Sequence, residues 1–347
     1  MSMEHIDIGP DFVAIAGIFS DHAFLEYLHN QSTIDYVEPN QVYSTTHMQP
    51  SVIKHQMNQK RELKTSQAAN WGLARINQRQ LGDLNEYQFD DISGEGVTVF
   101  VLDTGVYAEH IDLEGRASHS ANVVKYEDAT DMGGHGTHVS GKIIGKEYGV
   151  AKGAQVKSVK ILNKSGDGST SSLLRGVQHV IQNAVPGKTL VNLSLSGAKS
   201  KLLDEALDNL VLKYNIPVFV SAGNAGTDSC FFSPSSNPNV FSVGAIDRSD
   251  NVPKFSNVGE CVDIYAPGRD IVSTYIGSVD SSKSMDGTSM ASPHVAGIAA
   301  NLMSKKQFNT AQEVYDALRA LATSGVVHFD AVKSSSPNNN LLAFNEI

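Results

Sequence analysis

The chain has 347 residues, enough for one large α/β domain with a small appendage. Acidic residues outnumber basic residues 37 to 27 and lysine and arginine form no block, so neither nucleic acid nor an anionic membrane is expected as a partner. Apolar runs stay shorter than the roughly 18 residues that a membrane-spanning helix needs, so no transmembrane anchor is expected.

The N-terminal part differs in pattern from the rest of the chain. Two apolar runs, 12–19 and 34–38, flank a helical stretch from about Asp21 to His29. The polar segment 44–68 lacks apolar periodicity and contains Lys60 and Arg61, which is the composition of a linker. We therefore expect a small unit over residues 1–43, a linker over 44–68 and a main domain over 69–347.

Apolar strands alternate with helical segments in the main domain. Strands are expected at 97–102, 156–162 and 190–195, with another ending near Ala222. Helices are expected at 173–184 and 201–212. This alternation predicts a mostly parallel sheet with flanking helices.

Three short motifs supply the groups needed to make a serine nucleophilic. Asp103 ends the strand in VFVLDTGV, His135 lies at a potential helix start in GGHGTHVSG, and Ser289 precedes an apolar helix in DGTSMASPHVAG. In such a set the carboxylate orients the imidazole, the imidazole takes the proton, and the hydroxyl attacks a carbonyl carbon.

Each motif alone has a simpler explanation. Asp103 suits a turn after a strand, His135 suits a structural histidine, and Ser289 suits a helix N-cap. Only the combination and its order favour catalysis. Asp131 is expected to shape the loop before His135, and the other histidines considered, His138, His179 and His294, are assigned to packing or to the surface.

The motifs and their order resemble those of the subtilisin-like serine proteases (subtilases), in particular the proteinase K and cerevisin group. The resemblance runs from about Trp71 to Asn345. It implies a three-layer fold with a mostly parallel central sheet, and a serine endopeptidase that forms an acyl-enzyme. In the motif SAGNAG, the resemblance makes Asn224 a donor to the oxyanion.

Residues 1–43 resemble the C-terminal half of an inhibitory subtilase prodomain, with the segment YVEPNQV as the typical part. This implies an α+β prodomain that acts as an intramolecular inhibitor of a zymogen. Our hypothesis is a cut within the linker, so that the mature enzyme starts shortly before Trp71. The alternative is a permanently attached accessory domain.

The first half of such a prodomain is not present in this sequence, and residues 1–10 lack the pattern of a signal peptide. We expect a chain truncated at its N-terminus. The alternative is an unusual intracellular form.

The resemblance also implies a cleft that binds polypeptide substrates as an added antiparallel strand. Relatives carry glycine at the position of Ser196. The serine side chain therefore stands where the substrate backbone is expected to come close. Asp167 predicts some preference for basic or polar residues in the nearby subsites. The implied substrate-binding residues are Ser165, Gly166, Asp167 and Gly168 on one edge, Ser194, Leu195, Ser196 and Gly197 on the other, and Ala222 and Gly223 on the wall of the first pocket.

Further expectations come from the same resemblance. A structural Ca²⁺ ion is implied, held by the carbonyls of Pro238 and Val240 and the carboxylate of Asp263, and hard oxygen ligands suit that ion. Cys230 and Cys261 stand where several relatives have a disulfide, with two buried free thiols as the alternative. A disulfide favours a secreted or vacuolar enzyme. A monomer is expected.

Two other functions share part of this pattern. Asp103-Thr104-Gly105 is also the catalytic triplet of aspartic proteases, but those enzymes need a second such triplet and none is found. A noncatalytic or permanently inhibited relative that acts as a binding protein is the second alternative. The catalytic positions are all filled, so the sequence favours the enzyme.

Overall fold

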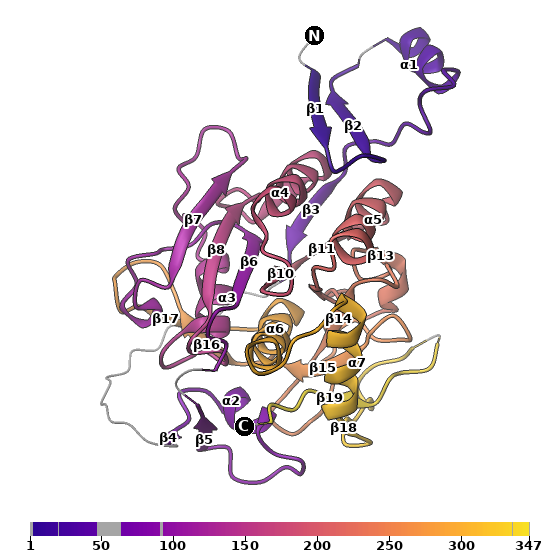
Figure 1. Cartoon of the computed structure of the whole chain (residues 1–347). Coiled ribbons are helices and arrows are strands. Elements are labelled where there is room, and N and C mark those ends of the chain that lie inside the picture. The colour runs from indigo at the N-terminus through magenta and orange to yellow at the C-terminus, as the bar shows by residue number, and fades with distance from the viewer. Residues whose placement is uncertain (1–2, 20, 47–63, 91–92, 335, 347) are drawn as a thin grey trace.

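The computed structural model describes residues 3–19, 21–46, 64–90, 93–334 and 336–346. A nine-stranded sheet forms the centre of the main domain, in the order β18-β19-β15-β14-β12-β10-β6-β8-β7 (Figure 1). Its pairs are parallel except for β18 with β19. The strands are β6 (Thr98–Asp103), β7 (Ala117–Asn122), β8 (Gln155–Lys160), β10 (Thr189–Leu193), β12 (Val218–Ser221), β14 (Phe241–Ile246), β15 (Ile264–Pro267), β18 (Thr323–Ser324) and β19 (Leu341–Leu342).

Helices cover both faces of this sheet, which confirms the predicted three layers. Consecutive residues of a strand point to opposite faces. Gly176 of α4 lies against Leu102 of β6, whereas Gly136 of α3 lies against the next residue, Asp103. In Figure 1, α4 and α5 lie on one side of the sheet and α3 and α6 on the other. The helices of this domain are α2 (Trp71–Ile76), α3 (His135–Ile144), α4 (Thr170–Asn183), α5 (Lys201–Asp208), α6 (Thr288–Lys305) and α7 (Ala311–Leu321), with short turns η1 (Ile111–Leu113), η2 (Asn209–Lys213) and η3 (Ser229–Phe231).

The strand β6 shows why the sheet forms. Val99, Phe100, Val101 and Leu102 are all buried, although they alternate between the two faces. A parallel sheet covered on both sides needs such a continuous apolar run, which explains the absence of polar alternation in the sequence.

The N-terminal segment begins with an antiparallel hairpin and a helix. The hairpin pairs β1 (Met3–Asp7) with β2 (Val13–Gly17), and α1 (His22–His29) is capped by Asp21. Strand β3 (Val42–Thr45) then leaves this unit and joins a separate four-stranded sheet, in the order β13-β11-β3-β9. The other members are β9 (Asp167–Ser169), β11 (Leu195–Ala198) and β13 (Phe232–Ser233).

The ends of the predicted linker 44–68 are strands. Its first residues belong to β3, and its last residues form β4 (Lys64–Gln67), which pairs with β5 (Glu86–Phe89). Lys60 and Arg61 lie outside the described residues. The residues of β3 do not predict a strand by themselves, because the partners that hold this strand come from distant parts of the chain. A further hairpin joins β16 (Ile271–Thr274) and β17 (Ser282–Met285).

A disulfide joins Cys230 to Cys261, with the Cα atoms 5.3 Å apart. This confirms the predicted pair over the free-thiol alternative. Among the described residues, no helix is both long and apolar enough to cross a membrane.

Candidate active site

Asp103 and His135 form the first half of the site. Asp103 is the last residue of β6 and is fully buried, and His135 is the first residue of α3. The ring Nδ1 of His135 lies 2.8 and 2.9 Å from the two carboxylate oxygens of Asp103. A buried carboxylate at this distance selects the tautomer with its proton on Nδ1, which leaves Nε2 as the basic atom.

The carboxylate of Asp131 ties the Asp103 strand to the His135 helix. One of its oxygens accepts hydrogen bonds from the Thr104 hydroxyl and from the backbone N–H groups of Gly133 and Gly134. The other oxygen accepts from the N–H and hydroxyl of Thr137. Asp131 therefore does shape the loop, and it also holds the neighbours of both Asp103 and His135.

Ser289 lies at the start of α6, as the sequence indicated. Gly287 precedes the helix with a φ of 147°, a conformation that favours glycine. The Ser289 hydroxyl donates a 3.0 Å hydrogen bond to the carbonyl oxygen of Ser194 and accepts a 3.1 Å hydrogen bond from the backbone N–H of Thr46. Ser289 is fully buried, and its hydroxyl oxygen is in contact with both the backbone N–H and the hydroxyl of Thr46.

Asn224 faces the carbonyl of the same threonine. Its side-chain Nδ2 donates a 2.6 Å hydrogen bond to the Thr46 oxygen. Its Oδ1 accepts from the backbone N–H and the hydroxyl of Thr288, at 3.0 and 2.9 Å. Thr288 thus fixes which end of the amide points at the carbonyl, as an oxyanion donor requires.

The two predicted substrate edges lie on either side of β3. Tyr43 and Ser44 pair with Gly168 and Asp167 on β9, and with Gly197 and Ser196 on β11. The register at Ser196 is regular, so its side chain does not prevent the backbone approach. The backbone N–H of Thr45 donates to the carbonyl of Gly166, and the hydroxyl of Ser44 donates to Asp167 at 2.6 Å.

Ala222 and Gly223 lie next to Asn224, in a loop that Asn257 holds. The Asn257 side chain donates to the carbonyl of Ala222 and accepts from the N–H groups of Ala225 and Thr227. Gly223 has a φ of +102°, and a Cβ there would lie 2.4 Å from the Asn257 amide nitrogen. Sequence reasoning missed Asn257, Thr288 and Thr46, because no motif of the family assigned them a role.

Other predicted residues take no part in this arrangement. Ser165 is exposed at the turn before β9, where its N–H donates to Asn163. His138 and His294 are buried and bond to backbone carbonyls, whereas His179 is partly buried beside Ser120. The first two are packed in the core, as the sequence predicted.

The residues predicted to hold calcium do not fit that ion. One oxygen of Asp263 lies 2.7 Å from the Arg319 guanidinium, and the other accepts a 2.7 Å hydrogen bond from the N–H of Ser242. A guanidinium in direct contact with the carboxylate repels a divalent cation from the same place. Among the described residues, no cluster of three or more histidine, cysteine or acidic side chains could hold a metal ion.

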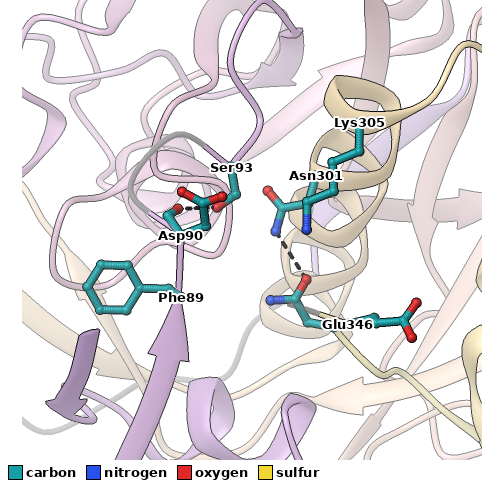
Figure 2. A pocket seen from close by; sticks show the side chains of 7 residues that line it. Phe89, Asp90, Ser93, Asn301, Lys305 and Glu346 are labelled. Atoms are coloured by element: carbon teal, nitrogen blue, oxygen red, sulfur yellow. Dashed lines mark hydrogen bonds between the residues drawn. The ribbon is translucent and has the colours of Figure 1, made fainter. Parts of the chain in front are cut away.

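A small surface pocket lies at the other end of α6 (Figure 2). Asn301 and Lys305 line it from the last turns of the helix, about 18 and about 24 Å along the axis from Ser289. The Asn301 amide donates to the side chain of Asn345 at 3.1 Å. The pocket is therefore separate from the candidate active site. Its other lining residues are Phe89, Asp90, Ser93 and Glu346.

The fold and the site together define a class of enzyme. A helix-borne serine contacts the residue that follows an extended strand, an oriented amide donates to the carbonyl of that residue, and an imidazole is held by a buried carboxylate. These are the parts of a serine protease that binds its substrate as a β-strand.

The chain belongs to the subtilase family, whose model matches residues 94–339. Subtilisin-like protease 2 of Pseudogymnoascus destructans is 40% identical over 283 residues, which cover 82% of this chain and 69% of that protein. Cerevisin of Saccharomyces cerevisiae is 39% identical, over 84% of this chain and 45% of that protein. The crystal structure of a cold-adapted subtilisin-like serine proteinase superposes with a TM-score of 0.74 at 36% identity, covering 81% of this chain and all of that one. These findings confirm a serine-type endopeptidase.

Proposed function

We propose that this chain is the zymogen of a serine endopeptidase with Asp103, His135 and Ser289 as its triad. In this proposal, residues up to Thr46 are the prodomain, and the peptide bond between Thr46 and His47 is the one cleaved. The observation that carries the proposal is the Thr46 carbonyl, which accepts from Asn224 while Ser289 contacts the same residue. A scissile carbonyl needs this position between nucleophile and oxyanion donor.

The chemistry follows from these positions. The hydroxyl oxygen of Ser289 attacks the carbonyl carbon of Thr46, and Nε2 of His135 takes the hydroxyl proton at the same time. The Asn224 amide stabilises the negative charge on the carbonyl oxygen. His135 then gives the proton to the departing amine of His47, leaving an ester between Thr46 and Ser289. Water, activated by His135, hydrolyses the ester and frees the serine.

Contacts outside the cleft support an inhibitory role for the N-terminal segment. Asn40 accepts from the backbone N–H of Ser171 in the first turn of α4, at 3.0 Å. Glu38 accepts from the backbone N–H of Leu202 in the first turn of α5, at 3.2 Å, and from the hydroxyl of Ser200. Helix N-termini carry unsatisfied N–H groups and partial positive charge, so both contacts stabilise the bound segment.

The proposed cut falls at the start of the predicted linker rather than shortly before Trp71. A released strand that keeps its pairing with β9 and β11 would still occupy the cleft, so inhibition would last until the prodomain is degraded or dissociates. The mature enzyme is proposed to act as a monomer on other polypeptides. Its disulfide suits an oxidising compartment, such as a vacuole or the outside of the cell.

Expression of the 347-residue chain tests the proposal. We expect the wild-type chain to split after Thr46, with His47 as the new N-terminus by sequencing and intact mass, and the Ser289→Ala variant to remain whole. Ser292→Ala, a buried serine of the same helix, is the matched control and should split. A fluorophosphonate should label the processed wild type and not Ser289→Ala. Cleavage beside Trp71, or equal cleavage of Ser289→Ala, would contradict the proposal, and absence of labelling would favour a noncatalytic relative.

A further inference from the structure

The side chain of Thr46 enters a polar pocket rather than an apolar one. Its hydroxyl lies between two serine hydroxyls: it donates a 3.0 Å hydrogen bond to the oxygen of Ser221, at the end of β12, and it also contacts the hydroxyl oxygen of Ser289. Thr46 is 8% exposed and Ser221 is fully buried. The pocket that receives the residue before the scissile bond therefore contains a buried polar group at hydrogen-bonding distance.

The direction of the hydrogen bonds defines what this pocket accepts. The Ser221 hydroxyl donates its own proton to the carbonyl oxygen of Leu195, at 3.1 Å. Its oxygen is thereby left as an acceptor aimed at the incoming side chain. A threonine or serine fills this role with its hydroxyl proton, whereas valine has the same shape as threonine but no donor.

We propose that Ser221 is a specificity-determining residue, which makes this enzyme favour threonine or serine before the scissile bond. The inference rests on the proposed function, because it takes Thr46 as the first residue cleaved. The physical basis is the cost of leaving a buried acceptor without a partner, which exceeds the net gain of an ordinary hydrogen bond.

Two fluorogenic peptides test this subsite. One carries the sequence of residues 43–48, Tyr-Ser-Thr-Thr-His-Met, and the other has valine in place of the threonine that corresponds to Thr46. The processed wild-type enzyme should cleave the threonine peptide with a kcat/KM about 5- to 10-fold higher. In Ser221→Ala the ratio should fall to about one, because the valine peptide no longer leaves a buried acceptor unpaired and the threonine peptide loses its hydrogen-bond partner. Ser242→Ala, a buried serine on the neighbouring strand β14, is the matched control and should keep the wild-type ratio.

The possible results distinguish a failure of this proposal from a failure of the proposed function. Equal cleavage of both peptides by the wild type, or a preference that persists in Ser221→Ala, would overturn the role of Ser221 and leave the protease intact. Failure of the wild type to cleave either peptide, together with no fluorophosphonate label on Ser289, would instead overturn the proposed function.

A second inference comes from Asp263, away from the cleft. Arg319 of α7 reaches the carboxylate with its Nη2 at 2.7 Å, and its guanidinium carbon lies 5.1 Å from the centre of the Phe241 ring. Its Nη1 contacts Asp316 one turn earlier in the helix, at 3.0 Å. The arginine is thus held on three sides and links α7 to the start of β14.

We infer that the Arg319 guanidinium takes the structural role that a bound cation would have at Asp263. The carboxylate is mostly buried and needs a positive partner, and a guanidinium supplies both charge and directed hydrogen bonds. The fold at this place is then independent of calcium.

Thermal unfolding of the full chain, made inactive by Ser289→Ala, tests this inference. We expect the same Tm in EDTA and in excess calcium. Adding Arg319→Met should lower the Tm by about 2 to 4 °C, and calcium should recover part of the loss. Arg248→Met, at an exposed loop arginine, is the control and should leave the Tm unchanged. A calcium-dependent rise in the parent that Asp263→Asn abolishes would overturn the inference, and so would an unchanged Tm in Arg319→Met.

Discussion

The amide of Asn224 and the carbonyl of Thr46 lie 2.6 Å apart, although 178 positions separate the two residues in the chain. The amide cannot turn away, because Thr288 holds its oxygen with two hydrogen bonds. The amide is therefore held in one orientation, which suits the proposed role of Asn224, because a preorganised donor needs no reorganisation as charge develops on a carbonyl oxygen.

Replacing Asn224 by alanine should lower kcat of the processed enzyme by about 100- to 1000-fold, a magnitude known from a subtilisin. KM should change little, because the oxygen is negatively charged only near the transition state. Steady-state kinetics on the threonine peptide measures both constants. A rise in KM at unchanged kcat would show that Asn224 binds substrate without stabilising the transition state.

Replacing Asp131 by asparagine should reduce both stability and kcat. The amide cannot accept all the hydrogen bonds that the carboxylate accepts from Thr104, Thr137 and the glycines before His135. We expect the free energy of unfolding to fall by about 2 to 4 kcal/mol, measured by urea unfolding of Ser289→Ala. Asp128→Asn changes an exposed carboxylate nearby and should have no effect.

Two buried histidines should lower the stability of the folded chain in acid, whereas burial raises the pKa of Asp204 to about 6, which acts in the opposite direction. Burial, reinforced by the nearby charge of Lys142 and by His135, lowers the pKa of His138 to about 3, and burial lowers the pKa of His294 well below its ordinary value. Below pH 6.5 the unfolded chain binds protons that the folded chain excludes, so unfolding becomes more favourable as the pH falls from 6.5 towards 3. For His138 the loss between pH 7 and pH 4 should be on the order of 3 kcal/mol.

Urea unfolding at a series of pH values checks this expectation, with Ser289→Ala as the parent. Adding His138→Gln removes one titrating group, so the decline between pH 6.5 and pH 4 should become shallower. Replacement of the exposed His29 by glutamine is the control and should leave the slope unchanged. A slope that His138→Gln leaves unchanged would show that His138 is protonated in the folded state over this range.

Loss of the disulfide should destabilise the chain without affecting the catalytic groups. The bond closes a loop over a sequence separation of 31, for which the entropy of the unfolded chain predicts about 3 to 4 kcal/mol. The double change Cys230→Ser and Cys261→Ser should lower the free energy of unfolding by that amount. Fluorophosphonate labelling of the folded double variant should be retained, whereas its loss would indicate that the loop supports the active site directly.

Much of the main domain could be predicted because its signals are local. The apolar run 97–102 predicted β6 to within one residue, and the glycines before His135 and Ser289 marked the starts of α3 and α6. The helix predicted over 201–212 is the α-helix α5 followed by η2, which is a short π-helix. Apolar periodicity does not distinguish one helical hydrogen-bonding pattern from another, so this change of geometry could not be predicted.

Strand β3 could not be predicted from its own residues. It is short, and its hydrogen-bonding partners, β9 and β11, lie more than a hundred residues away along the chain. Residues 44–46 read as the start of a polar linker, and Val42 and Tyr43 before them are too few to form an apolar pattern. The strand exists because two edges with free backbone groups lie at the right spacing.

The sequence by itself determined the family of this protein and its class of enzyme, a serine-type endopeptidase. Asp103, His135, Asn224 and Ser289 lie in motifs whose residue types and order carry the meaning, and the apolar periods around them specify strands and helices through local burial. Only the tertiary structure decided which carbonyl meets the Asn224 amide, which hydroxyls face Thr46 and which cation meets Asp263. Those answers depend on side chains brought together from distant segments, and Thr46 and Ser289, 243 positions apart, meet only after the sheet has formed.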